Sequence, residues 1–151
     1  MPTLLIVHHT VSPATHTMFE AIRDGASDPS LHAVRIVARA ALEATTSDVL
    51  AADALVLCTP ANLGYMSGAL KHFFDQIYYP CLDATRGRPF GLAVHGNEDA
   101  AGATHGVEVI TTGLRWRIAL LPVVVTGAPS AADIEACGNL GATLAALALA
   151  S

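Results

Sequence analysis

The chain lacks the composition of several large protein classes. Only 14% of its 151 residues are charged while 52% are hydrophobic, which excludes an intrinsically disordered chain. Acidic residues outnumber basic ones by 13 to 8, so no basic surface is expected and we predict no nucleic-acid partner. No apolar run approaches the roughly 18 residues that a transmembrane helix needs, so we predict no membrane span.

Cysteine is scarce and forms no pair motif. The three cysteines, Cys58, Cys81 and Cys137, lie far apart with no Cys-x-x-Cys spacing. The chain also enters an apolar strand pattern at Thr3, without a basic leader or a small-residue cleavage site. We therefore expect three reduced thiols in a cytoplasmic protein.

A metal site is not expected either. His8 and His9 are neighbours at the end of a predicted strand, where successive side chains point to opposite faces of a sheet. No carboxylate lies near them in the sequence. The pair is therefore poorly placed to chelate one ion.

Short apolar runs alternate with helical patterns along the whole chain. The runs are predicted strands at residues 3–7, 32–39, 54–57, 90–95 and 123–126, and the helical patterns start near residues 12, 46, 67, 102 and 130. Strands that alternate with helices and lack polar alternation indicate parallel pairing with both faces covered. We predict one α/β domain over residues 1–151, with helices on both faces of a five-stranded parallel sheet.

The order of the predicted strands follows from their polarity. Arg35 and Arg39 suit an edge strand, and Pro122, which cannot donate to a ladder, suits the entrance of another. The two most apolar runs belong inside the sheet. These preferences fit the order 2-1-3-4-5, in which ligands bind beyond the carboxyl ends of the strands near the first and third.

The turn after the first strand carries three hydroxyl groups and no cation. Thr10, Ser12 and Thr15 surround the start of a helix whose free N–H groups favour an anion. Capping by Ser12 accounts for that residue and for Pro13, but we expect it not to account for the two threonines. The dinucleotide-binding motif Gly-x-Gly-x-x-Gly and the triphosphate-binding motif Gly-Lys-Ser/Thr are both missing. A phosphate monoester is therefore the expected ligand.

The turn after the third strand has a more specific pattern. Pro60, Gly64 and the run Met66-Ser67-Gly68 precede Lys71, Phe73 and Asp75. This pattern resembles the second loop of flavodoxin-like quinone reductases and NAD(P)H-dependent FMN reductases. Thr10-x-Ser12-x-x-Thr15 similarly resembles the flavin mononucleotide phosphate loop of flavodoxins, except that Pro13 stands where glycine is usual. The resemblance covers nearly the whole chain and implies a flavodoxin-like three-layer sandwich.

The resemblance also implies an FMN site built from three turns. It places the phosphate on Thr10, Val11, Ser12, Ala14 and Thr15, with Val11 and Ala14 contributing backbone groups. It places the isoalloxazine ring along Pro60, Ala61, Asn62, Leu63 and Gly64, with Tyr65 at the ring edge. Near the pyrimidine end, it implies contacts from His95, Gly96 and Asn97.

We therefore expect an FMN-binding oxidoreductase that takes electrons from NAD(P)H and passes them to a quinone or similar small acceptor. The residues identify no catalytic acid or base. Two alternatives stay open: a flavodoxin-type electron carrier, and a flavodoxin-like module that has lost flavin. The resemblance leaves a homodimer or homotetramer possible.

Three other features have structural interpretations. Cys58 lies in an apolar strand and is expected to be a buried, inert thiol. Ser67 has no Gly-x-Ser-x-Gly elbow around it and is expected to cap a helix. Tyr78-Tyr79-Pro80 is expected to follow that helix and to contact a partner subunit or the flavin pocket.

Overall fold

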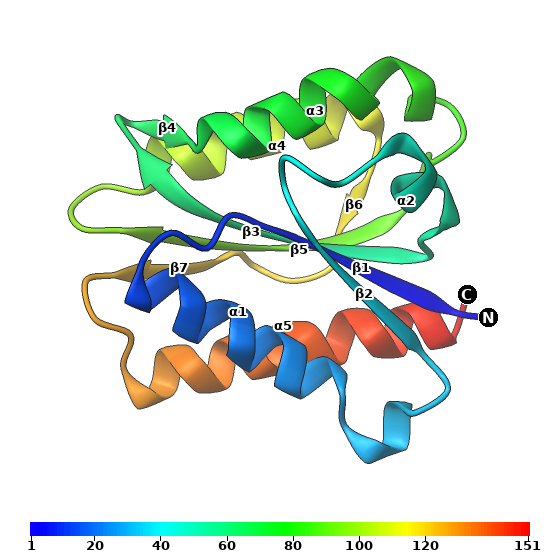
Figure 1. Ribbon diagram of the computed structural model, residues 1–151, viewed down its shortest axis with the longest axis horizontal. Helices are drawn as coiled ribbons and strands as arrows, with labels where there is room; N and C mark the ends of the chain where they lie inside the picture. The colour runs from blue at the N-terminus through cyan, green and yellow to red at the C-terminus, as the bar shows by residue number, and fades with distance from the viewer.

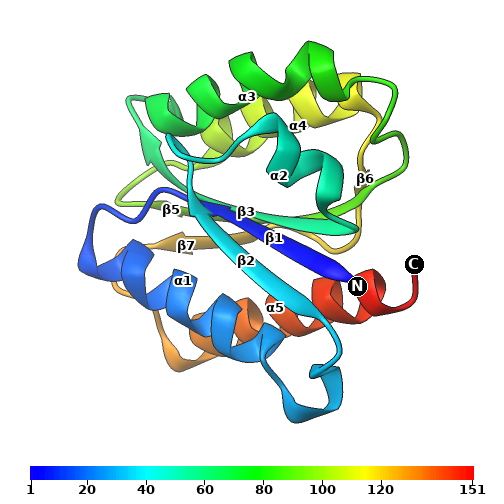
Figure 2. The ribbon, with the colours of Figure 1, turned by 45° about the vertical axis from the view of Figure 1, so that its right-hand side comes forward.

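Three layers make up the molecule, with the sheet between two layers of helices (Figure 1). The computed structural model describes residues 1–151. In Figures 1 and 2, α1 and α5 cover one face of the sheet and α2, α3 and α4 cover the other. The helices are α1 (Pro13–Ala26), α2 (Thr46–Ala51), α3 (Gly68–Cys81), α4 (Ala101–Leu114) and α5 (Ala131–Leu149), with a 3-10 turn η1 at Pro29–Leu31.

The sheet confirms the predicted topology. Its main path runs β2-β1-β3-β5-β6, all parallel, so the first and third strands are neighbours at the centre. The strands are β1 (Thr3–His8), β2 (Arg35–Ala40), β3 (Ala54–Asn62), β4 (Tyr65–Met66), β5 (Pro89–Gly96), β6 (Arg117–Ile118) and β7 (Val123–Thr126).

The number of strands differs from the prediction, because there are seven rather than five. The predicted fifth strand is β7, and the two-residue strand β6 before it was not predicted; the two strands pair with opposite ends of β5. The chain leaves the ladder between them over residues 119–122, where Pro122 has no N–H to donate. The additional strand β4 pairs antiparallel with the end of β3.

Side-chain caps determine where several helices begin. The hydroxyls of Ser12, Ser67 and Ser130 accept hydrogen bonds from the first turns of α1, α3 and α5, as predicted. The short helix α2 is capped by Thr45, next to its predicted start near residue 46.

Two helix ends were predicted wrongly. The helix that starts near residue 102 was expected to run to Arg117, but α4 stops at Leu114, because Arg115 adopts a left-handed conformation and the chain turns into β6. Helix α3 continues to Cys81, so Tyr78, Tyr79 and Pro80 form its last turn rather than following it.

Each face of the sheet has its own apolar core. The side chains of Leu5, Val7, Leu55 and Leu57 point toward α2–α4, and the intervening residues of β1 and β3 point toward α1 and α5. Helices α1 and α5 approach closely, since a Cβ at Gly25 would collide with the backbone of Gly138. None of the helices has the length and apolar character that crossing a membrane would require.

Candidate functional site

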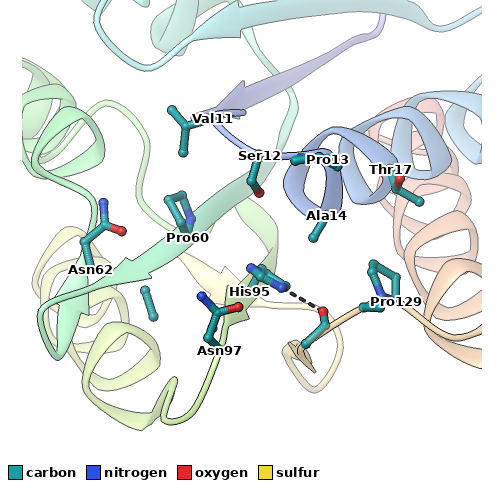
Figure 3. A pocket seen from close by; sticks show the side chains of 14 residues that line it. Val11, Ser12, Pro13, Ala14, Thr17, Pro60, Asn62, His95, Asn97 and Pro129 are labelled. Atoms are coloured by element: carbon teal, nitrogen blue, oxygen red, sulfur yellow. Dashed lines mark hydrogen bonds between the residues drawn. The ribbon is translucent and has the colours of Figure 1, made fainter.

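A cavity of about 500 Å³ lies where the carboxyl ends of β1, β3, β5 and β7 meet (Figure 3). Four segments line it: the start of α1, the end of β3, the end of β5 and the turn between β7 and α5. The lining residues are Val11, Ser12, Pro13, Ala14, Thr17, Pro60, Ala61, Asn62, His95, Gly96, Asn97, Gly127, Ala128 and Pro129. Both the position and the size are those of a small-molecule site in this kind of sheet.

One wall of the cavity is a β-hairpin, where the sequence predicted a loop. Strand β3 continues through Pro60 to Asn62, and Ala61 and Asn62 pair with Met66 and Tyr65 of β4. Leu63 and Gly64 form the two-residue connection with φ of 51° and 78°, the left-handed conformation at both positions that type I′ hairpins require. Backbone pairing therefore holds Pro60 and Ala61 in place beside the cavity.

Two glycines of α4 receive this hairpin. A Cβ at Gly102 would collide with the carbonyl oxygen of Gly64, and one at Gly106 would lie 2.5 Å from the ring of Tyr65. The glycines are four residues apart, so they share one face of the helix. The hairpin turn therefore packs against α4 at Gly102, and the ring of Tyr65 packs against α4 at Gly106.

The first turn is held by its own side chains. Thr15 is fully buried, and its Oγ1 accepts hydrogen bonds from the N–H groups of Val11 (3.1 Å) and Ser12 (3.0 Å). The Ser12 hydroxyl in turn accepts from the Thr15 N–H at 3.1 Å, which completes a capping box. Our expectation that capping would not account for Thr15 was therefore wrong.

The third hydroxyl of this turn also has a partner within the protein. Thr10 Oγ1 lies 3.2 Å from His8 Nδ1 at the end of β1. The His8 ring packs against Phe19 of α1, with the ring centroids 4.1 Å apart. Burial and the positive charge of Arg23 lower the pKa of His8, so its imidazole is neutral near pH 7.

The start of α1 offers one free donor to an anion. Pro13 has no N–H, and those of Val11, Ser12 and Thr15 bind hydroxyls within the turn. The Ala14 N–H makes no hydrogen bond within the protein, and Ala14 lines the cavity. A phosphate here would meet this N–H, the positive end of the helix dipole and the Ser12 hydroxyl.

The opposite wall contains an element that sequence reasoning missed. His95 is buried, and its Nε2–H donates to the carbonyl oxygen of Gly127 at 2.8 Å (Figure 3). The Gly127 N–H donates to the Gly96 carbonyl oxygen at 3.0 Å, so the turn 127–129 is fastened to the end of β5. Gly127, with φ of 73°, and Pro129 are turn signals that could have indicated this segment.

The structure brings nine of the fourteen predicted cofactor-binding residues to the cavity: Val11, Ser12, Ala14, Pro60, Ala61, Asn62, His95, Gly96 and Asn97. The other five do not line it. Thr10 and Thr15 have the partners described above, Leu63 and Gly64 form the hairpin turn, and the Tyr65 ring lies against Gly106. For all fourteen residues, contact with the cofactor stays a prediction.

The remaining candidates have structural roles. Cys58 is buried as predicted, and burial raises its thiol pKa to about 12, which keeps the thiol protonated near pH 7. Ser67 caps α3, as predicted. Tyr79 is exposed on the last turn of α3 and stays a predicted interface residue, whereas the hydroxyl of Tyr78 packs toward Gly113 of α4.

Comparisons with known proteins agree with this architecture. Residues 8–130 match the family described as NADPH-dependent FMN reductase. A curated relative, a flavodoxin from Aquifex aeolicus (strain VF5), is 35% identical over 77 residues. That match covers 51% of this chain and 40% of the relative, so it spans less than half of the relative's length.

Solved structures share the fold at low identity. A flavodoxin from the domain Archaea superposes with a TM-score of 0.82 at 17% identity, over 97% of this chain and 99% of that one. A flavodoxin, WrbA-like protein from Agrobacterium tumefaciens gives 0.79 at 19%, over 99% of both chains. An oxidoreductase from Corynebacterium diphtheriae gives 0.77 at 19%, over 100% and 98%. The flavodoxin-like fold expected from the sequence is confirmed.

Proposed function

The chain belongs to the NADPH-dependent FMN reductase family, and from this membership we propose that it is an FMN-dependent oxidoreductase. Its reaction takes a hydride from NAD(P)H and, with one proton from solvent, reduces a quinone or similar two-electron acceptor to the hydroquinone level. FMN supplies the hydride-accepting and electron-donating chemistry when it is bound.

One cavity joins the two features that a flavin mononucleotide needs. At one end lie the free Ala14 N–H and the Ser12 hydroxyl at the start of α1, which fit a phosphate monoester. Beside them, Pro60 and Ala61 give an apolar wall whose backbone is held by pairing, Pro60 with β5 and Ala61 with β4. This arrangement supports the proposal more strongly than any single residue.

The polar side chains at the far end suit the edge of the flavin ring. Asn62 and Asn97 lie on the walls formed by β3 and β5, and their amides can both donate and accept hydrogen bonds (Figure 3). The hydrogen bond from His95 to Gly127 holds its imidazole at the cavity with the proton on Nε2. These residues orient the ring, and the hairpin and the turn 127–129 exclude water from two sides.

Titration of the purified protein with FMN and with riboflavin tests the proposal. We expect FMN to bind more tightly than riboflavin, with a change in flavin absorbance and fluorescence. NAD(P)H oxidation in the presence of a quinone should then exceed the rate given by the same concentration of free FMN. A folded protein that leaves both flavin spectra unchanged would refute the proposal.

Two capping serines provide a matched pair of variants. Ser12→Ala and Ser130→Ala each remove a capping box, at the starts of α1 and α5, and each should cost about 1 kcal/mol of stability. Only Ser12→Ala should weaken FMN, about tenfold, because a charge-assisted hydrogen bond is worth about 1.5 kcal/mol or more. Riboflavin affinity should change little. Equal effects of both variants on FMN would contradict the phosphate assignment.

An electron carrier is the second candidate, favoured by the flavodoxin relative and by exposed acidic residues at the site. Glu98 and Asp99 are exposed immediately after Asn97 at the rim of the cavity. A carrier docks partner proteins through such charges and turns over little by itself. Flavin binding without any NAD(P)H oxidation beyond that of free FMN would favour the carrier over the reductase.

A further inference from the structure

We infer that His8 is a positioning residue for the phosphate end of the flavin, and that it takes up a proton from solvent when the phosphate binds. This inference rests on the proposed function, since it requires a phosphate monoester at the start of α1 that the hydroxyl of Thr10, which does not line the free cavity, turns to meet. It adds a pH-dependent selection for FMN over flavins that lack the phosphate.

The inference begins with the hydrogen bond between Thr10 and His8. Their 3.2 Å contact can run in either direction while the cavity is free, because a neutral imidazole nitrogen either donates or accepts. A phosphate dianion has only acceptors, so Thr10 must donate its hydroxyl proton to the phosphate. His8 Nδ1 then donates to Thr10 Oγ1, which both the neutral Nδ1–H tautomer and the imidazolium can do, and the negative charge of the dianion favours the imidazolium.

Among the three hydroxyls of the turn, that of Thr10 can be redirected to donate to a phosphate with the least disturbance of the turn. The hydroxyls of Ser12 and Thr15 bind each other at 3.0 Å and hold the backbone of the turn, so reorienting them disturbs the start of α1. The Thr10 hydroxyl binds only the imidazole. It can therefore turn toward an anion without breaking the capping box.

The surroundings of His8 keep its imidazole neutral until an anion arrives. On α1, Phe19 covers one face of the ring, and the Arg23 guanidinium lies 5.2 Å from the centroid of Phe19. Arg23 is paired with Glu20 at 2.8 Å, and the neighbouring His9 also disfavours a second positive charge. Glu43, after β2, acts in the opposite direction and favours the imidazolium.

The cavity has no permanently charged cation that could balance the negative charge of a phosphate. None of its lining residues is a lysine or an arginine. His8 is partly exposed and Nε2 makes no hydrogen bond within the protein, so solvent can deliver the proton there. A bound dianion stabilises the resulting imidazolium through Thr10, and the pKa of His8 should rise.

The direct test follows the His8 ring proton resonances by NMR during a pH titration of the wild-type protein. The three samples are the free protein, the protein saturated with FMN and the protein saturated with riboflavin. We expect FMN to raise the pKa of His8 by about one unit, within the range produced by a nearby opposite charge. Riboflavin should leave it unchanged, and an unchanged pKa with FMN would overturn the inference.

His8→Gln supplies an independent test, because glutamine can still donate to Thr10 but cannot titrate. At pH values below the pKa of His8 in the free protein, the advantage of the wild type over the variant in FMN affinity should approach about tenfold, since one pKa unit corresponds to a factor of ten. The two affinities should converge by pH 8. Because a phosphate monoester itself titrates near pH 6, the comparison is made between the proteins at each pH.

His72→Gln is the matched control, since His72 is exposed on α3 and its side chain hydrogen-bonds within the protein only to Gln76. It should retain the pH dependence of the wild type. Identical pH profiles for His8→Gln and the wild type would refute the role of His8 while leaving the proposed function intact. Failure of the folded wild type to bind FMN at all would refute the proposed function itself.

Discussion

The two turns that flank the cavity are built in different ways. The hairpin between β3 and β4 is held by backbone pairing and by α4, and none of its supports has to change when a ligand enters. The turn between β1 and α1 is held by hydroxyl and imidazole side chains that are also its candidate ligands. The wall proposed for the ring is therefore preformed, whereas the proposed anion end must exchange internal hydrogen bonds for external ones.

The largest effect should come from breaking the support of the hairpin. In Gly102→Val, the new side chain would collide with the Gly64 backbone, and overpacking of this kind should cost about 2–3 kcal/mol. FMN affinity should fall with it, because Pro60 and Ala61 shift. Chemical denaturation and FMN titration measure the two effects.

Gly68→Ala is the control for this change. No atom lies within 4 Å of a Cβ at that position in the first turn of α3. Alanine should be neutral there or stabilise the helix by about 0.5 kcal/mol. If Gly102→Val proved as harmless as Gly68→Ala, the hairpin would not depend on α4.

A smaller loss should follow from removing the buried hydroxyl of the other turn. Thr15→Val leaves the Val11 and Ser12 N–H groups without their acceptor, which should cost about 1–2 kcal/mol. Asp133→Ala removes the equivalent residue of the α5 capping box at an exposed position and should cost less. Equal losses in denaturation midpoint would show that the Thr15 hydroxyl has no role beyond capping.

A residue better suited to the hairpin turn should increase the stability of the protein, in contrast to the two changes above. Leu63 is fully exposed and holds a left-handed conformation that asparagine adopts far more readily. Leu63→Asn should therefore raise the free energy of unfolding by about 0.5–1 kcal/mol. Leu121→Asn is the control, since Leu121 is 89% exposed and has no positive φ, and its substitution should leave stability unchanged. A destabilised Leu63→Asn variant would contradict a preformed hairpin.

The smallest effect concerns pH and the free protein. The folded pKa of His8 lies below its ordinary value of 6.5, so the unfolded chain binds more protons in the interval between the two. Stability should rise with pH across that interval and level off above about pH 7. Thermal unfolding from pH 5 to 8 should show a shallower rise for His8→Gln than for the wild type, and parallel curves would contradict it.

Local signals were sufficient for much of the fold. The capping serines and the apolar strands can be read from neighbouring residues, and Val123–Thr126 was predicted with its observed bounds. The short strand β6 was not predictable, because its two residues are a strand only through their pairing with Pro89 and Phe90 of β5. The hairpin was missed because Leu63 is a poor residue for a type I′ turn, so the segment resembled an irregular loop.

The candidate site shows the same limit. The predicted turns do meet at one cavity, since the carboxyl ends of parallel strands lie at one edge of the sheet. The partners of individual side chains could not be predicted. Thr10 binds His8 and the Tyr65 ring packs on Gly106 because of tertiary packing that no local pattern encodes.

The glycine face of α4 has a consequence for anyone who wishes to redesign this protein. Tyr65 and Gly106 are a size-matched pair, and Gly64 and Gly102 are in backbone contact. A hairpin transplanted from another scaffold would bring a different side chain to position 65. That side chain would not fit the surface at Gly106, which accommodates a tyrosine ring. The hairpin and the first two turns of α4 therefore form a single exchangeable module, to be moved together or left alone.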